Sequence, residues 1–427
     1  MSNVHLDDRH FVPAVKRWFS EPLVLTEGKG AVVRDSEGKE YLDLFAGHAA
    51  LSLGYCHPKV VSAIKEQAEK LIFSPYDFHT IPSVELADRL VTIAPKTLKR
   101  CYFASAGAEA VECALYMARK FTKKFEIIAL YGAFHGRTYG ARSAVGWYYY
   151  KRGMGPYLPG VTHIPSYYCY RCVLGLEHPS CDLRCAKMLE DAIKYQCAGD
   201  VAAFIAEPLQ GTAGNVPAPD GYFAAVEKIL GSNGILFIDD EVITGFGRTG
   251  KLFAIEHYGV TPDLMTVAKA LGGGVPISGV VSREDVAQAF APMDYFTTYG
   301  GNPLSCAAAN AAVQAILDEK LSEKAARLGD HFLKRLGELT NRHKIIGDVR
   351  GKGLLIGMEL VLDRRTKEPA RRESLKLREE ARKRGLLLPA GFGWLGNVVR
   401  INPPLVITEE QVDEAVEKVD ECLKVIS

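Results

Sequence analysis

Short apolar runs of strand length alternate with amphipathic, helix-like stretches through the middle of the chain. The runs are "CYFAS", "EIIALY", "VAAFIAE", "ILFIDDEV" and "LMTVAKAL", and helix-like patterns at 108–121 and 221–234 stand among them. A strand that is apolar on every residue is buried on both faces, which is typical of a parallel sheet covered by helices. The pattern therefore predicts an α/β fold, with a mostly parallel central sheet in a large domain.

The two ends of the chain show a different pattern. Near the start, 28–45 carries strand-like pieces around "DSEGK", which predicts a hairpin turn. From Asn302 a long helical region follows, with at least one break, and then come a hairpin-like strand pair at 349–361 and a basic helix at 371–385. Helices beside an antiparallel sheet predict a smaller α+β domain, which the N-terminal strands join. The expected parts are an N-terminal segment of the small domain (1–55), the large domain (56–310) and the C-terminal small domain (311–427).

Composition and charge narrow the classes of protein. With 427 residues, 48% of them hydrophobic, the chain can bury two cores. Its 52 basic and 51 acidic residues give a formal charge of +1, so nothing indicates a nucleic-acid partner. No apolar run reaches the ~18–20 residues that cross a bilayer, and the first residues lack the apolar region of a signal peptide. We therefore expect a cytoplasmic protein with no membrane partner.

Polar side chains stand at the ends of the central apolar runs. "CYFAS" ends at Ser105, "VAAFIAE" at Glu207, "ILFIDD" at Asp239 and Asp240, and "LMTVAK" at Lys269. Each one alone could be an ordinary polar residue after a strand. In open α/β sheets, however, ligands bind beyond the carboxyl ends of the strands, so these residues are expected to meet at one edge. Their coincidence predicts a single site.

The chemistry of these residues points to one coenzyme. "SAGAEAVECALYMAR" at 105–119 is a small-residue turn that opens a helix, which suits a phosphate, although Ser and Gly there could also be a simple cap. Phe134 and His135 stand between glycines, so an aromatic ring could lie on a planar ligand. Asp240 could hold a protonated pyridine nitrogen, and Lys269 could form an imine with an aldehyde once burial makes its amine neutral. Together they describe a site for pyridoxal 5′-phosphate (PLP).

Longer motifs carry a family resemblance from about residue 20 to the C-terminus. They are "FIDDEVITGFGRTGKLFAIEHYGVTPDLMTVAKALGGGVP", "TTYGGNPLSCAAANAA", "YGAFHGRTYGA" and "RINPPLVITEEQV". With these stretches the chain resembles the class III (ω-amino acid type) aminotransferases of PLP fold type I. The resemblance implies a homodimer, or a dimer of dimers, in which residues of both subunits build each active site. It implies no metal in that site.

The resemblance also implies roles for individual residues. Lys269 would be the Schiff-base lysine and the proton shuttle, and Asp240 would pair with the pyridine nitrogen. Val242 and Phe134 would pack on the two faces of the ring. The other coenzyme contacts implied are Ala106, Gly107 and Ala108 at the phosphate, His135, Glu207 and Ile243 around the ring, and Thr298 at the phosphate of the neighbouring subunit's coenzyme.

Substrate contacts follow from the same resemblance. Arg400, in "VVRINPP", matches the arginine that binds the substrate carboxylate with a bidentate fork, and its alternative is a surface strand residue. Trp18, Phe19 and the segment "LFAGHAAL" stand where relatives shape the substrate pocket. The run Trp147–Tyr150 could line the entrance for the amine or could pack at a surface or an interface.

Two departures from the family pattern bear on specificity. The common "DEVQ" is "DEVI" here, so Ile243 cannot donate the hydrogen bond that a glutamine would make to the ring oxygen. The common "EPVQGEGG" is "EPLQGTAG", so Thr212 replaces a glutamate that pairs with the arginine in α-ketoglutarate-using members. Without that glutamate, the charge of Arg400 has no carboxylate partner when the bound ligand itself has no carboxylate. We therefore expect a small 2-oxo acid such as pyruvate as the amino acceptor.

Four cysteines lie in a predicted insertion at 166–186. Their spacing is C-x2-C-x8-C-x3-C, from Cys169, Cys172, Cys181 and Cys185. Four thiols so close could bind zinc or an iron–sulfur cluster, form two short disulfides, or stay reduced. All three states stay open, and we expect the insertion to be structural rather than catalytic.

Three functions follow from these observations. The first is a transaminase that moves an amino group from an amino acid or ω-amine to a small 2-oxo acid, with a ping-pong mechanism. The second is an amino acid racemase or epimerase, because removing an α-proton and returning it to the other face uses the same lysine. The third is a coenzyme-binding redox sensor without turnover, in which the cysteines are the working part. The retained Lys269, Asp240 and phosphate turn argue for the first two.

Overall fold

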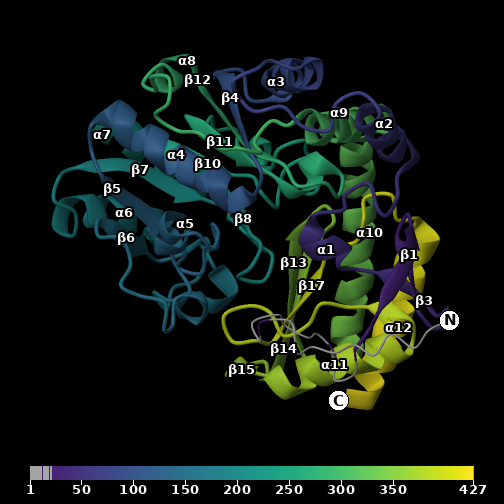
Figure 1. Cartoon of the computed structure of the whole chain (residues 1–427). Coiled ribbons are helices and arrows are strands. Elements are labelled where there is room, and N and C mark those ends of the chain that lie inside the picture. Colours follow the sequence, from purple (N-terminus) through teal and green to yellow (C-terminus); the bar gives the residue numbers. More distant parts are fainter. Residues whose placement is uncertain (1–11, 13–18, 20–21, 427) are drawn as a thin grey trace.

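The computed structural model describes Val12, Phe19 and residues 22–426, and these form two lobes (Figure 1). The larger lobe contains a seven-stranded sheet, and the smaller lobe contains the C-terminal strands and three long helices. Among the residues described, no helix is long and apolar enough to cross a membrane. The cytoplasmic location and the absence of a nucleic-acid partner stay predictions.

The large sheet is parallel except for one strand. β10 is parallel to β11 and β7, and β5 is parallel to β7 and β6, whereas β12 runs antiparallel to both β11 and β4. This is the mostly parallel sheet that the continuous apolar runs predicted, and it agrees with the fold that the family resemblance implies. In spatial order its strands are β4 (Leu98–Ala104), β12 (Ser278–Arg283), β11 (Leu264–Val267), β10 (Leu236–Asp240), β7 (Val201–Ala206), β5 (Glu126–Leu130) and β6 (Val161–Ile164).

Helices cover both faces of this sheet. Successive residues of a strand point to opposite faces, so strands that are apolar throughout must be buried on both. Ile205 and Ile238 pack with the apolar side chains of α4 (Gly107–Thr122), and Phe204 and Phe237 pack on the other side, with α6 (Arg184–Tyr195) and α7 (Tyr222–Asn233). Shorter or more peripheral elements of this lobe are α2 (Pro58–Ala68), α3 (Ile81–Ile93), α5 (Tyr139–Ala144), α8 (Glu284–Ala287), β8 (Leu209–Gln210) and β9 (Val216–Pro217).

The small lobe joins segments from both ends of the chain. β13 (Ile346–Lys352) and β14 (Leu355–Asp363) form the predicted antiparallel hairpin, and β17 (Val398–Ile401) pairs with β14 on its other side. In a second sheet, β16 (Leu386–Leu387) lies parallel to β3 (Glu40–Asp43), so N-terminal and C-terminal strands share one sheet. The remaining elements are β1 (Leu25–Lys29), β2 (Val32–Asp35), α1 (Ala46–Ala49), β15 (Glu368–Pro369), α10 (Leu321–Arg342), α11 (Arg371–Lys383) and α12 (Glu409–Ile426).

The long helical region breaks once, as its length predicted. α9 (Pro303–Asp318) ends at Glu319, and Lys320 has a left-handed backbone (φ 49°) before α10 begins. α9 therefore passes through the expected domain limit at residue 310, and it packs on α2 and α3 of the large lobe. We propose that the large domain extends to this break; the other expected limits stay predictions.

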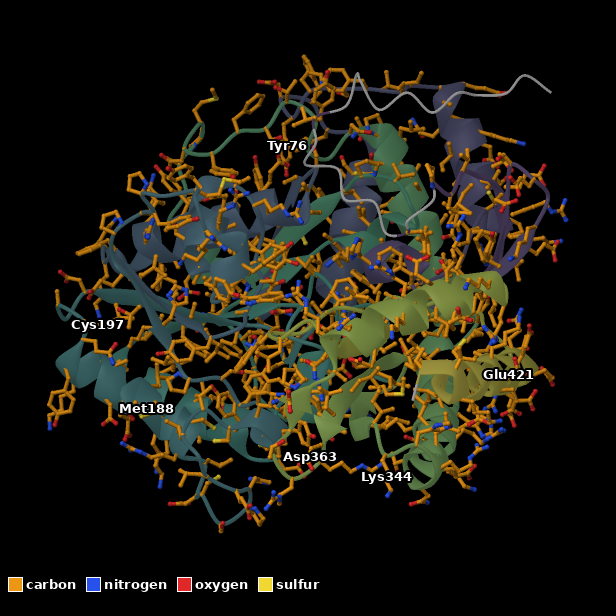
Figure 2. All side chains as sticks on the ribbon, turned by 90° about the horizontal axis from the view of Figure 1, so that it is seen from below. Tyr76, Met188, Cys197, Lys344, Asp363 and Glu421 are labelled. Atoms are coloured by element: carbon orange, nitrogen blue, oxygen red, sulfur yellow. The ribbon has the colours of Figure 1, made fainter. Side chains whose placement is uncertain are left out.

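A cluster of charged side chains holds the two lobes together next to the cysteine insertion. Glu359 of β14 is fully buried and accepts hydrogen bonds from Tyr168 and Arg171 of the large lobe. Arg350 of β13 binds the same carboxylate at 3.0 Å and the Tyr168 hydroxyl at 2.7 Å. Figure 2 shows side chains filling the space between the lobes, with Asp363 and Lys344 labelled on the small-lobe side and Met188 on the large-lobe side. A buried carboxylate with three such donors is strongly favoured in its charged form.

Candidate functional site

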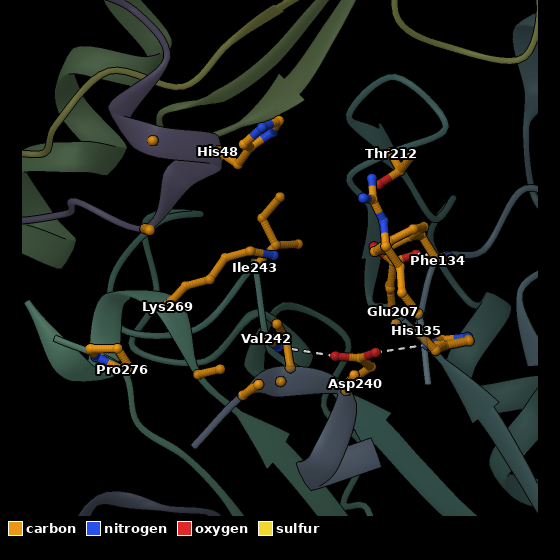
Figure 3. A pocket seen from close by; sticks show the side chains of 18 of the residues that line it. His48, Phe134, His135, Glu207, Thr212, Asp240, Val242, Ile243, Lys269 and Pro276 are labelled. Carbon is orange, nitrogen blue, oxygen red and sulfur yellow. Dashed lines mark hydrogen bonds and ion pairs between the residues drawn. The ribbon is translucent and has the colours of Figure 1, made fainter. Parts of the chain in front are cut away.

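The carboxyl ends of the parallel strands meet at one cavity of about 660 Å³. β4 is followed by Ser105, β7 by Glu207 and β11, after Ala268, by Lys269, while β10 ends at Asp240, and all four side chains line the cavity. Figure 3 shows Lys269 extending across this space toward Ile243, with Asp240 below it. The edge of the sheet that the sequence pattern indicated is therefore the site.

Nearly all the residues proposed from the sequence line this one cavity. Those present are Ala106, Gly107, Ala108, Phe134, His135, Glu207, Thr212, Asp240, Val242, Ile243, Lys269 and Arg400. Thr298 lies outside it, in the loop before α9, and Trp18 falls outside the described residues. The structure thus brings the set together, and the individual roles remain proposals.

Lys269 occupies an unusual backbone position directly after the sheet. Its φ is 47°, in the left-handed region that residues other than glycine seldom adopt, and it begins the short 3-10 turn η5 (Lys269–Gly272). Burial lowers the pKa of its amine from the ordinary value to about 8, against the opposing effect of Asp240, while the charge of Arg400 lowers it further. Part of the amine is therefore neutral near physiological pH, as the imine chemistry requires.

Asp240 is held in a fixed orientation by its neighbours. Its Oδ2 lies 2.7 Å from His135 Nδ1, and its Oδ1 accepts from Thr266 Oγ1 and from the Val242 amide, each at 3.1 Å (Figure 3). The side chains of Asp240 and His135 are almost completely buried. A buried carboxylate favours a positive charge beside it, such as a protonated pyridine nitrogen.

The turn between β4 and α4 brings the N-terminus of a helix to the cavity, where an anion could bind. The first N–H groups of a helix have no partner within the helix, and its dipole favours an anion there. A Cβ at Gly107 would lie 2.9 Å from Val242 Cγ1, so only glycine allows this turn to approach the opposite wall. Ser278 Oγ of β12 donates to the Ala106 carbonyl at 2.8 Å and fixes the turn.

Phe134 and Glu207 form the wall beside Asp240. The carboxylate of Glu207 accepts from the amides of Phe134 and Gly211, each at 3.0 Å. Burial raises the pKa of Glu207 to about 7, with His135 and these amides opposing the rise and Asp240 adding to it. The ring of Phe134 meets Tyr150 edge to face, 4.9 Å between centroids. Glu207 therefore acts mainly by fixing the loop that carries Phe134.

Arg400 reaches the cavity from β17 of the small lobe. It is fully buried, its Nε donates to Asn215 Oδ1 at 3.2 Å, and its guanidinium lies 4.9 Å from the centre of the Phe392 ring. Burial lowers its pKa to about 10, while Tyr150 and Glu207 oppose that change. Among the described residues no carboxylate is close enough to form an ion pair with it, so the cavity presents a buried cation without a counter-ion.

Some cavity residues were not identified individually from the sequence. Phe392 lines the cavity, as do Gly47, His48 and Ala50 of the segment "LFAGHAAL", which was expected only as a region, and Tyr150 of the run Trp147–Tyr150. In the aromatic run, Tyr148 and Tyr149 are exposed, whereas Tyr150 faces inward from a 3-10 turn, η2 (Tyr148–Tyr150). The role of this run at the entrance or at an interface stays a prediction. No local signal marks Phe392.

The four cysteines of the insertion lie apart from this cavity: Cys169, Cys172 and Cys181 lie between β6 and α6, and Cys185 is the second residue of α6. Their side chains line a second, much smaller cavity. All ten cysteines of the chain are free thiols in this structure. Across the described ranges, no group of three or more His, Cys, Asp or Glu side chains is arranged to hold a metal ion. The structure thus describes the cluster in its reduced form.

The residues that line the cavity match the chemical groups of the predicted coenzyme. The close approach at Gly107 leaves a cradle that a Cβ would fill, a helix N-terminus faces it, and a buried amine and a buried carboxylate stand at two other positions. Phe134 and Val242 approach the space above Asp240 from two different sides (Figure 3). The donor set therefore matches a phosphate, an aldehyde and a ring nitrogen.

Comparisons with known proteins agree with this geometry. Residues 14–423 match the family model described as aminotransferase class-III. The acetylornithine aminotransferase of Methanothermobacter thermautotrophicus is 42% identical over 96% of this chain and 95% of its own length. The leucine/methionine racemase of Thermococcus litoralis is 41% identical over 96% and 93%. The (S)-enantioselective omega-transaminase from Thermomicrobium roseum has a TM-score of 0.91 at 37% identity, covering 98% of this chain and 96% of that one.

The chain belongs to the class III aminotransferase family, with PLP fold type I. It is a PLP-dependent aminotransferase of that class, and its cofactor is pyridoxal 5′-phosphate.

Proposed function

We propose that the enzyme moves an amino group from an amino acid or ω-amine to a small 2-oxo acid, with pyruvate favoured, by a ping-pong mechanism. One observation carries the proposal: Arg400 is a buried cation that faces the cavity without a counter-ion among the described residues. An uncompensated buried charge is costly, so the cation favours ligands that bring a carboxylate. Both an α-amino acid and a 2-oxo acid do so.

The chain's residues would hold the coenzyme at four points. The amides at Gly107 and Ala108 would bind its phosphate, Asp240 its ring nitrogen, Phe134 and Val242 its two faces, and Lys269 its aldehyde carbon. The bound group supplies an electron sink for the pair left when the substrate α-carbon loses a proton, and it carries the amino group between the two halves of the reaction. This lowers the barrier to a proton transfer that would otherwise be slow.

The proton transfers belong to Lys269. Burial lowers the pKa of its Nζ amine to about 8, so part of it is neutral near physiological pH and would take the proton from the substrate α-carbon and deliver it to the carbon that carried the aldehyde. His135 orients Asp240 through the 2.7 Å contact, so the carboxylate keeps the ring nitrogen protonated. The second half of the reaction reverses these transfers with the 2-oxo acid.

The preference for pyruvate follows from the residues near Arg400. At position 212 a threonine lines the cavity, and its hydroxyl cannot neutralise the guanidinium as a glutamate could. Ile243 packs against Gly211 so closely that a Cβ on this glycine would lie 2.8 Å from Ile243 Cδ1, so this wall has little free space. A ligand with one carboxylate and a small side chain fits such a wall better than one with a second carboxylate.

The comparison of acceptors tests this proposal. We would measure kcat/KM for pyruvate and α-ketoglutarate with a panel of amine donors, in the wild type, in Thr212→Glu and in the uncharged control Thr212→Val. Pyruvate is expected to be preferred by the wild type, and Thr212→Glu should improve donors that lack a carboxylate by several-fold. A clear preference of the wild type for α-ketoglutarate would reject the acceptor assignment.

Racemisation is the second candidate, because a relative 41% identical over 96% of the chain is named a leucine/methionine racemase. The two activities separate in one incubation. A single L-amino acid with no 2-oxo acid should keep its configuration if the enzyme is a transaminase. Loss of optical activity under these conditions, without transfer of the amino group, would establish the racemase instead.

We also propose that the enzyme is a homodimer, or a dimer of dimers, in which Thr298 reaches the partner's coenzyme phosphate. Support comes from exposed apolar side chains around that loop: Phe73 and Tyr299 are both exposed, with ring centroids 5.4 Å apart, and Leu71 and Ile72 are exposed beside them. A patch of this kind is typical of a subunit interface. Hybrids of Lys269→Ala and Thr298→Val chains test it.

The hybrid experiment has a specific expected result. If Thr298 acts across the interface, a mixed dimer contains one site with both defects and one site with neither, so mixing should restore activity above that of either variant alone. Unchanged activity in verified mixed dimers, or a monomer by light scattering, would contradict the proposal.

A further inference from the structure

The cysteine insertion, which the coenzyme chemistry does not use, contains a small second cavity. Its volume is about 20 Å³, roughly the space of one water molecule. All four thiols line it: Cys169, Cys172, Cys181 and Cys185. The rest of the lining is mostly apolar and includes Leu174, Leu176, Leu183 and Pro219. The segment lies between β6 and α6 in the large lobe (Figure 1).

The four thiols differ in their access to solvent. Cys169 is exposed, Cys172 and Cys181 are half-buried, and Cys185 is buried at the start of α6. The Sγ of Cys169 donates to the Tyr167 carbonyl at 3.6 Å. An oxidant from solvent therefore meets Cys169 first, and three further thiols stand around the same cavity.

The pKa values of the thiols influence how fast they react with an oxidant. Burial raises the pKa of Cys169, and the neighbouring Cys181 and Cys172 thiols raise it further. Burial also raises the pKa of Cys185 to about 12, with Cys169 the largest further contribution. Because the thiolate is the reactive form, burial slows the reaction of Cys169 and Cys185 with an oxidant.

We propose that Cys169 is a site of reversible oxidation, which hydrogen peroxide converts into a disulfide with one of the three thiols that share its cavity. The sulfur of Cys169 attacks one peroxide oxygen, the O–O bond breaks, and water leaves after proton transfer, giving a sulfenic acid. The second thiolate attacks that sulfur, the S–S bond forms, and a second water leaves. Two thiols and one peroxide thus give one disulfide and two waters.

The consequence is a stiffer connection between the lobes. Tyr167, two residues before Cys169, donates its hydroxyl to the Glu207 carbonyl at 2.5 Å in the wall of the coenzyme cavity. Tyr168 and Arg171 bind the buried Glu359 of the small lobe. A bond within the cluster constrains this segment, so the oxidised enzyme unfolds at a higher temperature, while turnover changes little because none of the four cysteines lines the coenzyme cavity.

Thiol mapping of the holoenzyme tests the site directly. The enzyme is treated with hydrogen peroxide, alkylated without reduction and digested. The expected result is the loss of two alkylated cysteines, one of them Cys169, with the other in the same segment, and their full recovery after dithiothreitol. Cys169→Ser should abolish the peptide that contains Cys169 cross-linked, whereas Cys56→Ser, which removes an exposed cysteine elsewhere, should leave it unchanged.

Two further measurements complete the test. The melting temperature of the oxidised wild type should rise by about 2–5 °C and return on reduction, and Cys169→Ser should show no rise. Full alkylation of all four cysteines after peroxide, irreversible over-oxidation of Cys169, or about one equivalent of zinc or iron per chain in the untreated holoenzyme would each overturn the proposal.

Discussion

The two ends of the coenzyme cavity are built in different ways. At one end, Lys269, Asp240 and the α4 turn come directly from the strand ends of a single sheet, and the Asp240 carboxylate is fixed by contacts of 2.7 to 3.1 Å with three neighbouring groups. At the other end, Arg400 and Phe392 come from the small lobe, and Tyr150 comes from a loop.

This difference separates reaction from specificity. The lysine end is fixed by backbone geometry and leaves no room for a Cβ at Gly107. The arginine end contains aromatic rings and the guanidinium of Arg400, which forms no ion pair with a carboxylate of the described residues. We propose that the carboxylate of a ligand pairs with it. We expect changes at the first end to abolish the reaction with every substrate, and changes at the second to alter the choice of substrate.

The largest effect is expected at Lys269. Lys269→Ala removes the amine that binds the coenzyme and moves the proton, so kcat/KM should fall by at least about 10³-fold with all substrates. Lys251→Ala, which changes an exposed lysine, is the control and should stay within about twofold. Steady-state assays check both, and the variant's folded state is verified by its melting temperature.

Next comes a comparison of neighbouring carboxylates on β10. Asp240→Asn removes the charge beside the ring nitrogen, and kcat should fall by about 10²–10³-fold. Asp239 has no hydrogen-bond partner for either side-chain oxygen within the described part of the chain, and burial, with Glu241 and Asp240, raises its pKa well above the usual range. Because a protonated acid resembles an amide, Asp239→Asn should leave kcat nearly unchanged. If kcat falls equally in both variants, the loss comes from changing a buried carboxylate of β10 and not from losing the contact of Asp240 with the ring nitrogen.

At the opposite end, Arg400→Gln should act on binding. The KM for a 2-oxo acid should rise by about 10–100-fold, as expected for the loss of charged hydrogen bonds, with a smaller change in kcat. Arg372→Gln on the exposed face of α11 is the matched control. A donor amine with no carboxylate should bind equally well to wild type and variant; if its KM rises in parallel, Arg400 is structural.

The smallest effect is a pH dependence that connects the two ends. The pKa of Lys269 is lowered to about 8, so its amine is protonated below that pH and neutral above it. The rate at which coenzyme-free enzyme binds PLP should rise about tenfold per pH unit up to about pH 8 and then level off. Since Arg400 contributes to this lowering, Arg400→Gln should move the midpoint upward, measured by the absorbance of bound coenzyme. If the pH midpoint is the same in Arg400→Gln and in the wild type, the charge of Arg400 does not influence the pKa of Lys269.

The sequence predicted the lysine end well because its determinants are local. Each residue there follows an apolar run, and the carboxyl ends of parallel strands must meet at one edge. The mostly parallel central sheet, its helices on both faces and the hairpin of β13 and β14 followed from the same periodicity, whereas β6 and β12 of the seven-stranded sheet were not predicted. Longer motifs, through the family resemblance, then implied roles for individual residues, which stay predictions.

The arginine end was predicted only in part, since long-range packing decides it. Phe392 lines the cavity from a loop that forms an antiparallel bridge with Val398 of β17, and no local pattern marks that position. Tyr148, Tyr149 and Tyr150 are alike in sequence, and only the η2 turn determines which one faces inward. The expected end of the large domain, residue 310, lies within α9, and our proposal of a later limit rests on the packing of that helix on α2 and α3, which is not visible in its sequence.

The antiparallel strand β12 has a consequence for how the reactive amine can travel. Val267 at the end of β11 pairs with Gly279 at the start of β12, so the short segment carrying Lys269 is anchored to adjacent positions of the sheet on both sides. Its Cα therefore stays in place, and the reach of the nitrogen is set by rotation of its four-carbon stem alone. The lysine side chain has a fixed length and starts from a fixed Cα, so its nitrogen reaches only carbons within that distance. To protonate a different carbon, a redesigned enzyme must therefore bind the substrate in a different position.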